Sequence, residues 1–396
     1  MPCSMVALFF MAMASMITAV VMVGEAGGES APVAWVQGAR RAAARDLIAQ
    51  LARQPQVARI VLVSADADGL LSPAVTDYRP TPPGRVHVGE ILARLSTELA
   101  IDRLLYFGGG AAPLLPDDTL SEIVQRLATA DQLILTNNRF ASDWAGLAPA
   151  GVLPTWISKL PRDNMLGWVL SDEAGLPHHT LPATAATRLD IDTPTDLLAL
   201  ALHPHTQPHL RAYLASLPLQ TATLRAALAV LGTSASRVFV AGRLGPEAWQ
   251  AINRVSHCWL RVVSEERGMV SSGRQQRGEV RSLLAAHIAA VGLDAFFATL
   301  ADWADAAFID TRVMLAHQQI MPDATTRFGS DLGLLELVAD PWLRAFTAAA
   351  QAAPIPIVLG GHGLLAGDML ACCEILATRP GWAGGPALPT SQQMIK

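Results

Sequence analysis

At 396 residues the chain is longer than one ordinary domain, so we expect two domains. Hydrophobic residues make up 51% of it and charged residues 16%, which is enough apolar surface for two sizeable cores. The 29 basic and 34 acidic residues give a net charge of −5, which excludes a basic nucleic-acid-binding protein, and we expect no nucleic-acid partner.

The first residues are almost continuously apolar from Met5 to Gly24, a run long enough to span a bilayer. No basic residue precedes the run, as a secretory signal would require. Residues 18–23 instead have the composition of a buried strand that leads into a glycine-rich turn. We therefore expect Met16 to be the true first residue, residues 1–15 to be a doubtful extension, and the protein to have no membrane partner. A genuine signal or anchor is the alternative.

From Met16 onward, apolar runs alternate with amphipathic stretches, which indicates a mostly parallel sheet covered by helices. The expected strands of the first half are 18–23, 60–64, 103–107 and 132–135. The expected helices, where apolar residues recur at helical spacing, are 41–53, 88–99 and 120–128. We expect the proline-rich segment 78–84 to be a surface loop, and Asp117 and Asp118 to cap the third helix.

The segment 203–209 contains three histidines and two prolines and interrupts this alternation. The prolines would hold it extended and separate the imidazoles, so a linker is favoured over a metal-binding tract. The first domain would then cover residues 16–202 and the second residues 210–385. In the second half we expect strands at 237–241, 259–263, 307–310 and 356–359, and helices at 221–231, 247–253, 280–291 and 341–350.

The four cysteines show no spacing typical of a metal site or of a disulfide framework. They are Cys3, Cys258, Cys372 and Cys373. Reduced thiols in a cytoplasmic protein are the simplest interpretation.

Two glycine-rich turns of the first half are suited to nucleotide binding. Gly24, Gly27 and Gly28 follow the first expected strand, where backbone N–H groups can cradle a phosphate. A tight connection without a ligand is the alternative for this turn. Gly109 and Gly110 follow another strand, at the sheet edge where ligands bind in open α/β sheets.

Asp190 and Asp192 lie in a short segment that precedes an expected helix. Carboxylates at positions i and i+2 of an extended chain point the same way and can share a divalent cation. Thr193 would cap the helix and Pro194 would be its first residue. The alternative is that the two aspartates only cap and solvate the start of that helix.

The order of these segments resembles the nucleotidyltransferases that attach a nucleoside monophosphate to molybdopterin (MobA-like enzymes) or to 2-phospho-L-lactate. Residues 190–197, Asp-Ile-Asp-Thr-Pro-Thr-Asp-Leu, match the closing segment of that family, and residues 113–115, Pro-Leu-Leu, match its middle motif. The first glycine-rich turn matches its phosphate loop. The resemblance covers residues 16–203 and implies a three-layer, Rossmann-like (GT-A-like) nucleotidyltransferase domain. A second α/β domain without such a resemblance would follow it.

The resemblance also implies a cytoplasmic enzyme that transfers a nucleoside monophosphate from a nucleoside triphosphate to a small anionic or phosphorylated acceptor. GTP is one candidate for the donor. Asp190 and Asp192 would bind Mg²⁺ and act in catalysis. The nucleotide would be held by five glycines, Gly24, Gly27, Gly28, Gly109 and Gly110. The partners would be small molecules, and a homo-oligomer is compatible with the sequence.

Departures from the family pattern favour a second hypothesis, a non-catalytic nucleotide- or ligand-binding protein. Ala111 stands where the family has its first metal-binding Asp. Glu25 and Glu29 lie in the first loop, where they would repel a triphosphate. Catalysis would need another carboxylate, with Asp66 and Asp68 as candidates. Whether the chain is an enzyme stays open on this evidence.

Three residues of the second half follow expected strands, where sites lie in this architecture, and we expect them to form a second ligand site: Asp310, Arg312 and His362. Four arginines between residues 267 and 281 could clamp a phosphate or carboxylate: Arg267, Arg274, Arg277 and Arg281. The last three have helical spacing, so a solvated helix face paired with Glu279 is slightly favoured.

Overall fold

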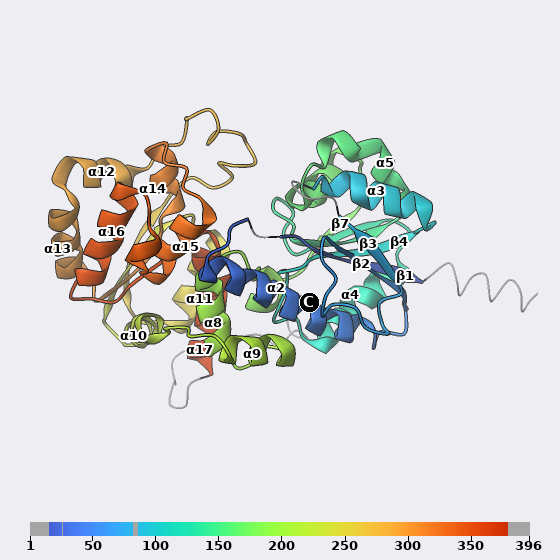
Figure 1. The fold of residues 1–396 in the computed structure, drawn as a ribbon, viewed down its shortest axis with the longest axis horizontal. Helices are drawn as coiled ribbons and strands as arrows, with labels where there is room; N and C mark the ends of the chain where they lie inside the picture. Colours follow the sequence, from blue (N-terminus) through green and yellow to red (C-terminus); the bar gives the residue numbers. More distant parts are fainter. Residues whose placement is uncertain (1–15, 26, 82–85, 379–396) are drawn as a thin grey trace, which may run out of the picture.

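The chain forms two lobes, each built around its own β-sheet, and the long helix α2 (Ala31–Leu51) runs from one to the other (Figure 1). The structure is a computed structural model that describes residues 16–25, 27–81 and 86–378. The apolar residues 5–15, Cys3 and the end of the second expected domain therefore lie outside the described residues.

The first lobe contains a seven-stranded sheet in the order β3-β2-β1-β4-β6-β5-β7. Neighbouring strands are parallel except that β6 runs antiparallel to both β4 and β5. The strands are β1 (Ile17–Val23), β2 (Val57–Ser64), β3 (Asp77–Pro80), β4 (Arg103–Gly108), β5 (Leu133–Thr136), β6 (Trp144–Ala148) and β7 (His178–Thr180).

Helices cover both faces of this sheet. Helix α4 (Asp117–Thr129) and the second half of α2 pack on one face, and α3 (Val88–Glu98) packs on the other. Every residue of β1 is buried, because parallel strands flank it and helices cover it on both sides. That burial explains why β1 is apolar at consecutive positions instead of alternate ones. The predicted three-layer α/β domain is confirmed.

The second lobe contains a four-stranded, fully parallel sheet in the order β11-β10-β8-β9. Its strands are β8 (Arg237–Gly242), β9 (Trp259–Ser264), β10 (Ala306–Asp310) and β11 (Ile357–Gly360). The helices around it are α10 (Ala222–Leu231), α11 (Pro246–Val255), α12 (Leu283–Val291), α13 (Leu293–Trp303), α14 (Arg312–His317), α15 (Ala324–Leu332), α16 (Pro341–Ala352) and α17 (Gly367–Ala377). The second α/β domain is therefore also confirmed.

Two local predictions are wrong. Residues 78–80, the first part of the expected loop 78–84, belong instead to the edge strand β3, which pairs with β2. Pro80 is tolerated there because an edge strand leaves one side of its backbone unpaired. The helix expected at 280–291 begins at Leu283, so residues 274–281 form a loop despite the helical spacing of their arginines. Gly273 and Gly278 in this region have φ values of +71° and +67°, which interrupt a helix.

The segment 203–209, expected to be a linker, is held on both sides. Thr206 donates a hydrogen bond from Oγ1 to the carbonyl of Leu200 at 2.6 Å. The backbone N–H groups of His209 and Leu210 donate to the carboxylate of Asp46 on α2 at 3.0 and 2.9 Å. Helix α9 (Pro208–Ala215) begins inside this segment. The domain boundaries placed there stay a prediction.

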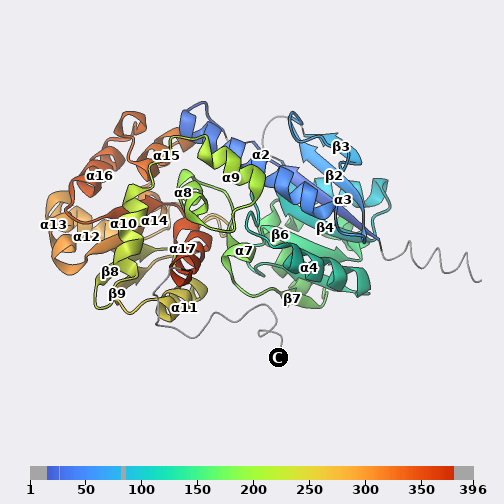
Figure 2. The same cartoon turned by 90° about the horizontal axis from the view of Figure 1, so that it is seen from below.

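One apolar core extends from the first lobe into the second. It includes Val33 and Val36 of α2, Leu197 of α8 (Pro194–Leu202), Phe308 of β10 and Met369 of α17. The second half of α2 belongs instead to the core of the first sheet. A helix of 21 residues is about 30 Å long, so α2 reaches both cores. Figure 2 shows α2 and α9 lying side by side along the two lobes.

Within the described part of the chain, no single helix is long and apolar enough to cross a membrane. Helices α12 and α13 meet the length and composition criteria only as a pair, and they are bent by 114° where they join. The described cysteines, Cys258, Cys372 and Cys373, are free thiols.

The contact between the lobes can be tested at Gly367, the first residue of α17. A Cβ atom there would lie 2.4 Å from the Cα atom of Leu189 and 2.8 Å from the carbonyl oxygen of Arg188. Backbone atoms cannot rotate away, so we expect Gly367→Ala to lower the free energy of unfolding by about 1–3 kcal/mol, the range for overpacking. Urea unfolding measures this change. The control is Gly151→Ala, whose Cβ would meet nothing within 4 Å, and equal midpoints for both variants would contradict the packing described.

Candidate functional site

The segment that carries Asp190 continues the pairing of the first sheet beyond β4. Asp190 and Ala111 form an antiparallel β-bridge. The N–H of Ala112 donates to the carbonyl of Leu189, and that of Ile191 donates to the carbonyl of Gly110, both at 3.0 Å. These bonds hold the backbone of Asp190 extended at the carboxyl end of β4, where sites lie in open α/β sheets.

The carboxylate that satisfies backbone N–H groups at the start of helix α8 belongs to Asp196, not to Asp190 or Asp192. This carboxylate accepts hydrogen bonds from the backbone N–H groups of Asp192 and Thr193, both at 2.6 Å. Thr193 is the N-cap and Pro194 the first helical residue, as predicted. The carboxylates of Asp190 and Asp192 are therefore not needed to satisfy the start of this helix.

Four aspartates line one hollow at this end of the first sheet: Asp143, Asp163, Asp190 and Asp192. Asp190 accepts no hydrogen bond from any described residue, whereas Asp192 accepts one from Arg40 Nη2 at 2.8 Å. Arg40 also donates from Nε to the carbonyl of Ile191 at 2.6 Å. This arginine therefore positions the Asp192 end of the segment.

Asp143 and Asp163 are held by their own partners. Asn137 donates from Nδ2 to Asp143 at 2.7 Å, and the Tyr106 hydroxyl donates to Asp163 at 2.9 Å. The sequence analysis did not include Asp143 among the candidate metal-binding residues. Asp143 lies in the connection that follows β5, and its place after a strand end was the available signal.

Crowding of these carboxylates changes their acidity. Burial, followed by the charge of Asp163, raises the pKa of Asp143 to about 7. Burial, followed by the charge of Asp192, raises the pKa of Asp190 well above its usual range. Burial also raises the pKa of Asp163. Deprotonating these groups would therefore bring together negative charges that Arg40 alone does not balance, and a bound cation would offset them.

The residues present fit Mg²⁺ in one particular mode. No three metal-ligating side chains are grouped for a metal anywhere in the described ranges, so the protein offers no complete cage. Mg²⁺ is commonly held by one or two carboxylates while substrate phosphates and water complete its shell. Asp190 and Asp192 fit that arrangement, with Asp143 close enough to Asp190 to affect its pKa.

Only three of the five predicted nucleotide-binding glycines line the hollow. Gly24, Gly109 and Gly110 line the hollow, together with Glu25. The N–H of Gly109 donates to the carbonyl of Met22 at 2.7 Å and is therefore not available to a phosphate. The nucleotide-binding roles of these glycines stay predictions.

Gly27 and Gly28 are exposed and lie outside the described lining of the hollow. The loop that carries them contacts the second lobe, where Thr325 donates from Oγ1 to Ser30 Oγ at 3.0 Å. Their nucleotide-binding roles likewise stay predictions.

Asp66 and Asp68 do not replace the missing carboxylate at position 111. Asp66 forms an ion pair with Arg41 at 3.1 Å, and the backbone carbonyl groups of both aspartates accept hydrogen bonds from the same arginine. Neither residue lines the hollow. Asp143 is instead the additional carboxylate that the fold brings to this place.

Asp310 and Arg312 are each engaged within the second lobe. The buried carboxylate of Asp310 accepts hydrogen bonds from Arg243 at 2.6 and 3.1 Å. Arg312 donates to the buried Asp331 at 2.9 and 2.5 Å. The sequence analysis did not single out Arg243 or Asp331. Both charges are already paired within the lobe, so a ligand would have to compete with Arg243 or Asp331. The ligand-binding roles of Asp310, Arg312 and His362 stay predictions.

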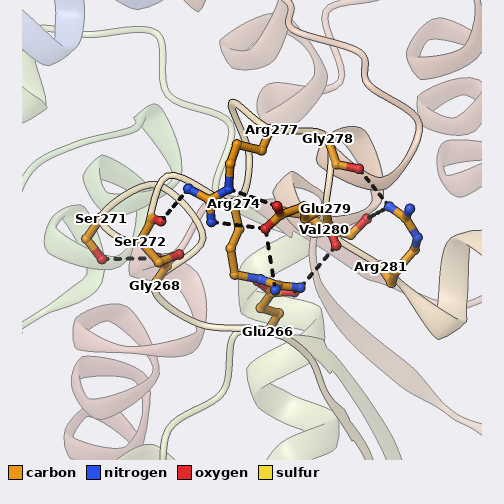
Figure 3. A network of polar contacts seen from close by, with 10 residues as sticks. All are labelled: Glu266, Gly268, Ser271, Ser272, Arg274, Arg277, Gly278, Glu279, Val280 and Arg281. Atoms are coloured by element: carbon orange, nitrogen blue, oxygen red, sulfur yellow. Dashed lines mark hydrogen bonds and ion pairs between the residues drawn. The ribbon is translucent and has the colours of Figure 1, made fainter.

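Three of the four arginines in the loop before α12 are also engaged, as Figure 3 shows. Arg274 pairs with Glu266 and Glu279, and Arg277 donates to Glu279 at 2.8 and 3.0 Å. Arg281 donates to backbone carbonyl groups. The expected pairing with Glu279 is therefore present, although on a loop instead of a helix.

His362 lines a second pocket, of about 770 Å³, between the two lobes. The first hollow and this pocket share four lining residues: Asp143, Asn164, Asp190 and Asp192. The turn that carries His362 lies directly on the aspartate segment. A Cβ atom at Gly363 would lie 2.5 Å from Asp196 Oδ1. Only a residue without a side chain allows this approach.

Asp196 faces a second buried acid, Asp368 of α17. Neither carboxylate oxygen of Asp368 has a hydrogen-bond donor among the described residues. Burial raises the pKa of Asp368 to about 6. Burial, followed by the charge of Asp368, raises the pKa of Asp196 well above its usual range. The pair therefore retains a proton at pH values where an exposed carboxyl group has lost it.

This proton makes stability depend on pH. The folded state binds it more tightly than the unfolded state, so the free energy of unfolding falls as pH rises from about 4 to about 6. The slope is up to about 1.4 kcal/mol per pH unit for one proton. Asp368→Asn removes the ionisable group and therefore this loss of stability. The new amide group can also donate a hydrogen bond to Asp196. We expect it to be more stable relative to the wild type above pH 6 than below pH 4.

Urea unfolding between pH 4 and pH 8 checks this expectation. Asp294→Asn, at an exposed position in the first turn of α13, controls for the change in net charge. A constant difference between Asp368→Asn and the wild type over the whole range would show that Asp368 does not hold the proton.

No family model matches the sequence, and no curated protein matches it. Among solved structures, a cytidylyltransferase from Leptospira borgpetersenii is similar over 47% of this chain and 84% of its own, with 17% identity and a TM-score of 0.35. CMP:2-keto-3-deoxy-manno-octonic acid synthetase complexed with CTP is similar over 46% and 95%, with 13% identity and a TM-score of 0.33. The bifunctional IspDF from Campylobacter jejuni is similar over 44% and 51%, with 11% identity and a TM-score of 0.31. The likeness is to folds of nucleotidyltransferase type, over about half of the chain, and it concerns the fold alone.

Proposed function

We propose that the protein is a nucleotidyltransferase that transfers a nucleoside monophosphate from a nucleoside triphosphate to a small anionic or phosphorylated acceptor, with release of pyrophosphate. GTP is one candidate for the donor. One observation carries the proposal: Asp190 and Asp192 line both the hollow of the first lobe and the pocket between the lobes. A donor in the hollow and an acceptor in the pocket would meet at these two carboxylates.

The hollow suits the donor because of its position and walls. It lies at the carboxyl ends of β1 and β4, with Gly24, Gly109 and Gly110 among its lining residues. Polar side chains, including those of Tyr106 and Asn164, also line it. The combination of backbone surfaces with a few polar groups is typical of small-molecule sites.

The aspartate segment supplies the electrostatic part of the site. Mg²⁺ bound there would neutralise phosphate charge as pyrophosphate leaves. Asp190 and Asp192 would hold the ion, and Arg40 keeps Asp192 in place from the side of α2. Asp190 has no competing hydrogen-bond donor among the described side chains, so its oxygens are free to bind a cation.

A second candidate is a protein that binds a nucleotide or another ligand without chemistry. Glu25, on the wall of the hollow, favours it, because its carboxylate would repel a triphosphate. Arg40, which lines the same hollow, is already paired with Asp192. The two candidates differ in whether pyrophosphate is released in the presence of Mg²⁺.

The measurement is pyrophosphate release from each nucleoside triphosphate with Mg²⁺, together with a thermal-shift titration of the same nucleotides. We expect Asp190→Asn to lower the rate roughly 10²- to 10³-fold, the scale for losing one preorganised electrostatic group. The fold should persist, because the substitution keeps the size of the side chain. Asp294→Asn should leave the rate unchanged.

An unchanged rate in Asp190→Asn would remove this residue from the mechanism. A Mg²⁺-independent thermal shift without pyrophosphate release, for every nucleotide, would favour the ligand-binding protein.

A further inference from the structure

We propose that the second domain completes the acceptor site, with Arg188, Arg267 and His362 binding a phosphate group of the acceptor in the pocket between the lobes. This inference rests on the nucleotidyltransferase function proposed above and names the class of acceptor, a phosphate monoester. Arg188 belongs to the short helix α7 (Ala185–Arg188) of the first lobe, and the other two belong to the second lobe.

Each of these three side chains has at least one nitrogen atom that could form a hydrogen bond and has no partner in the described part of the chain. Arg188 Nε and His362 Nδ1 are buried and have no hydrogen-bond partner. Arg267 is exposed at the pocket and forms no hydrogen bond or ion pair with any residue in the described part of the chain. Buried polar groups are nearly always bonded, so an unpartnered pair lining one pocket indicates a ligand.

Arg267 differs from Arg274 and Arg277, which follow it on the same loop, because it has no acidic partner among the described residues. Arg274 and Arg277, a few residues further on, are neutralised by Glu266 and Glu279 (Figure 3). Arg267 precedes them on the same loop and has no such partner. Its guanidinium instead lies against the start of α11, where a Cβ atom at Gly245 would come within 2.8 Å of Arg267 Nη1.

Two helix starts add to the positive field of this wall. Gly245 is the N-cap of α11, Gly367 is the first residue of α17, and both line the pocket. The free N–H groups of a helix start carry partial positive charge and favour anions. Together with the unpartnered side chains, they give the second-domain wall the chemistry of a phosphate site.

Apart from Arg188, the charged residues that the first lobe contributes to the pocket are the acidic Asp143, Asp190 and Asp192, which favours one orientation of the acceptor. On the second-domain side the pocket also contains Glu247, whose carboxylate lies 3.6 Å from Arg188 Nη2. A phosphate would therefore bind towards Arg267 and His362. The nucleophile at the other end of the acceptor would then face the aspartates, where the donor phosphate is expected.

The test uses the full chain and inorganic phosphate as the probe. Isothermal titration is carried out with the donor hollow occupied by a Mg²⁺-bound nucleotide, if one binds, and without it. We expect saturable phosphate binding that weakens roughly tenfold to a hundredfold in Arg267→Gln and in Arg188→Gln, the scale for one charge-assisted hydrogen bond. Arg254→Gln, at an exposed position in the last turn of α11, should bind phosphate as the wild type does.

The outcomes separate this proposal from the function on which it rests. Phosphate binding that is absent, or equal in Arg267→Gln, Arg188→Gln and Arg254→Gln, overturns the phosphate site while leaving nucleotide turnover untouched. Phosphate binding that depends on Arg267 in a protein that neither binds nor turns over a nucleotide supports the phosphate site and overturns the transferase. Because Arg267 is exposed, its variant should keep the melting temperature of the wild type, so a loss of binding reports on the site.

Discussion

The close approach of two backbone segments, 189–196 of the first lobe and 359–367 of the second, determines the geometry of the site. Thr195 donates from Oγ1 to the carbonyl of Leu359 at 3.0 Å, and a Cβ atom at Gly361 would lie 3.1 Å from the side chain of Thr193. Helices α2, α8 and α17 share one apolar core, and this core packs the two segments against each other. Since one segment carries Asp190 and the other His362, the second sheet cannot move without changing the pocket.

Charged groups in this protein fall into two sets that differ in how they are paired. Arg243 with Asp310 and Arg312 with Asp331 are buried pairs with short, two-pronged hydrogen bonds inside the second lobe. Removing one partner of such a pair would leave a buried charge without compensation. The groups that line the pocket between the lobes are incompletely paired instead. Among the charged groups of the pocket, Asp192 is paired with Arg40 and Arg188 with Glu247, whereas Asp190 and Arg267 have no ion-pair partner among the described residues.

The features that the sequence predicted are those set by neighbouring residues. The strand β1 was predicted to within one residue because burial on all sides makes nearly every position apolar. The cap of α8 follows from Thr193 and Pro194 alone. The pairing of Arg312 was not predictable, because Asp331 lies 19 residues away on another helix. The position of Asp143 near Asp190 was not predictable either, because it depends on the pairing of β6 between β4 and β5. The helical spacing of the arginines before α12 led to the wrong prediction of a helix, because glycines with positive φ interrupt helical structure there.

The absence of a carboxylate at position 111 is compatible with a working site for an electrostatic reason. The β-bridge places position 111 opposite Asp190, beside a hollow that is already lined by four aspartates, Glu25 and Arg40. Mutual repulsion and burial already raise the pKa of Asp143 to about 7, so an added acid would hold a proton and contribute little charge. What a cation needs is ionised oxygen on two sides, and Asp192, exposed and held by Arg40, provides one of them. In the site proposed above, the charge of a bound cation would keep Asp143 ionised, and this residue would then supply the charge that Ala111 lacks.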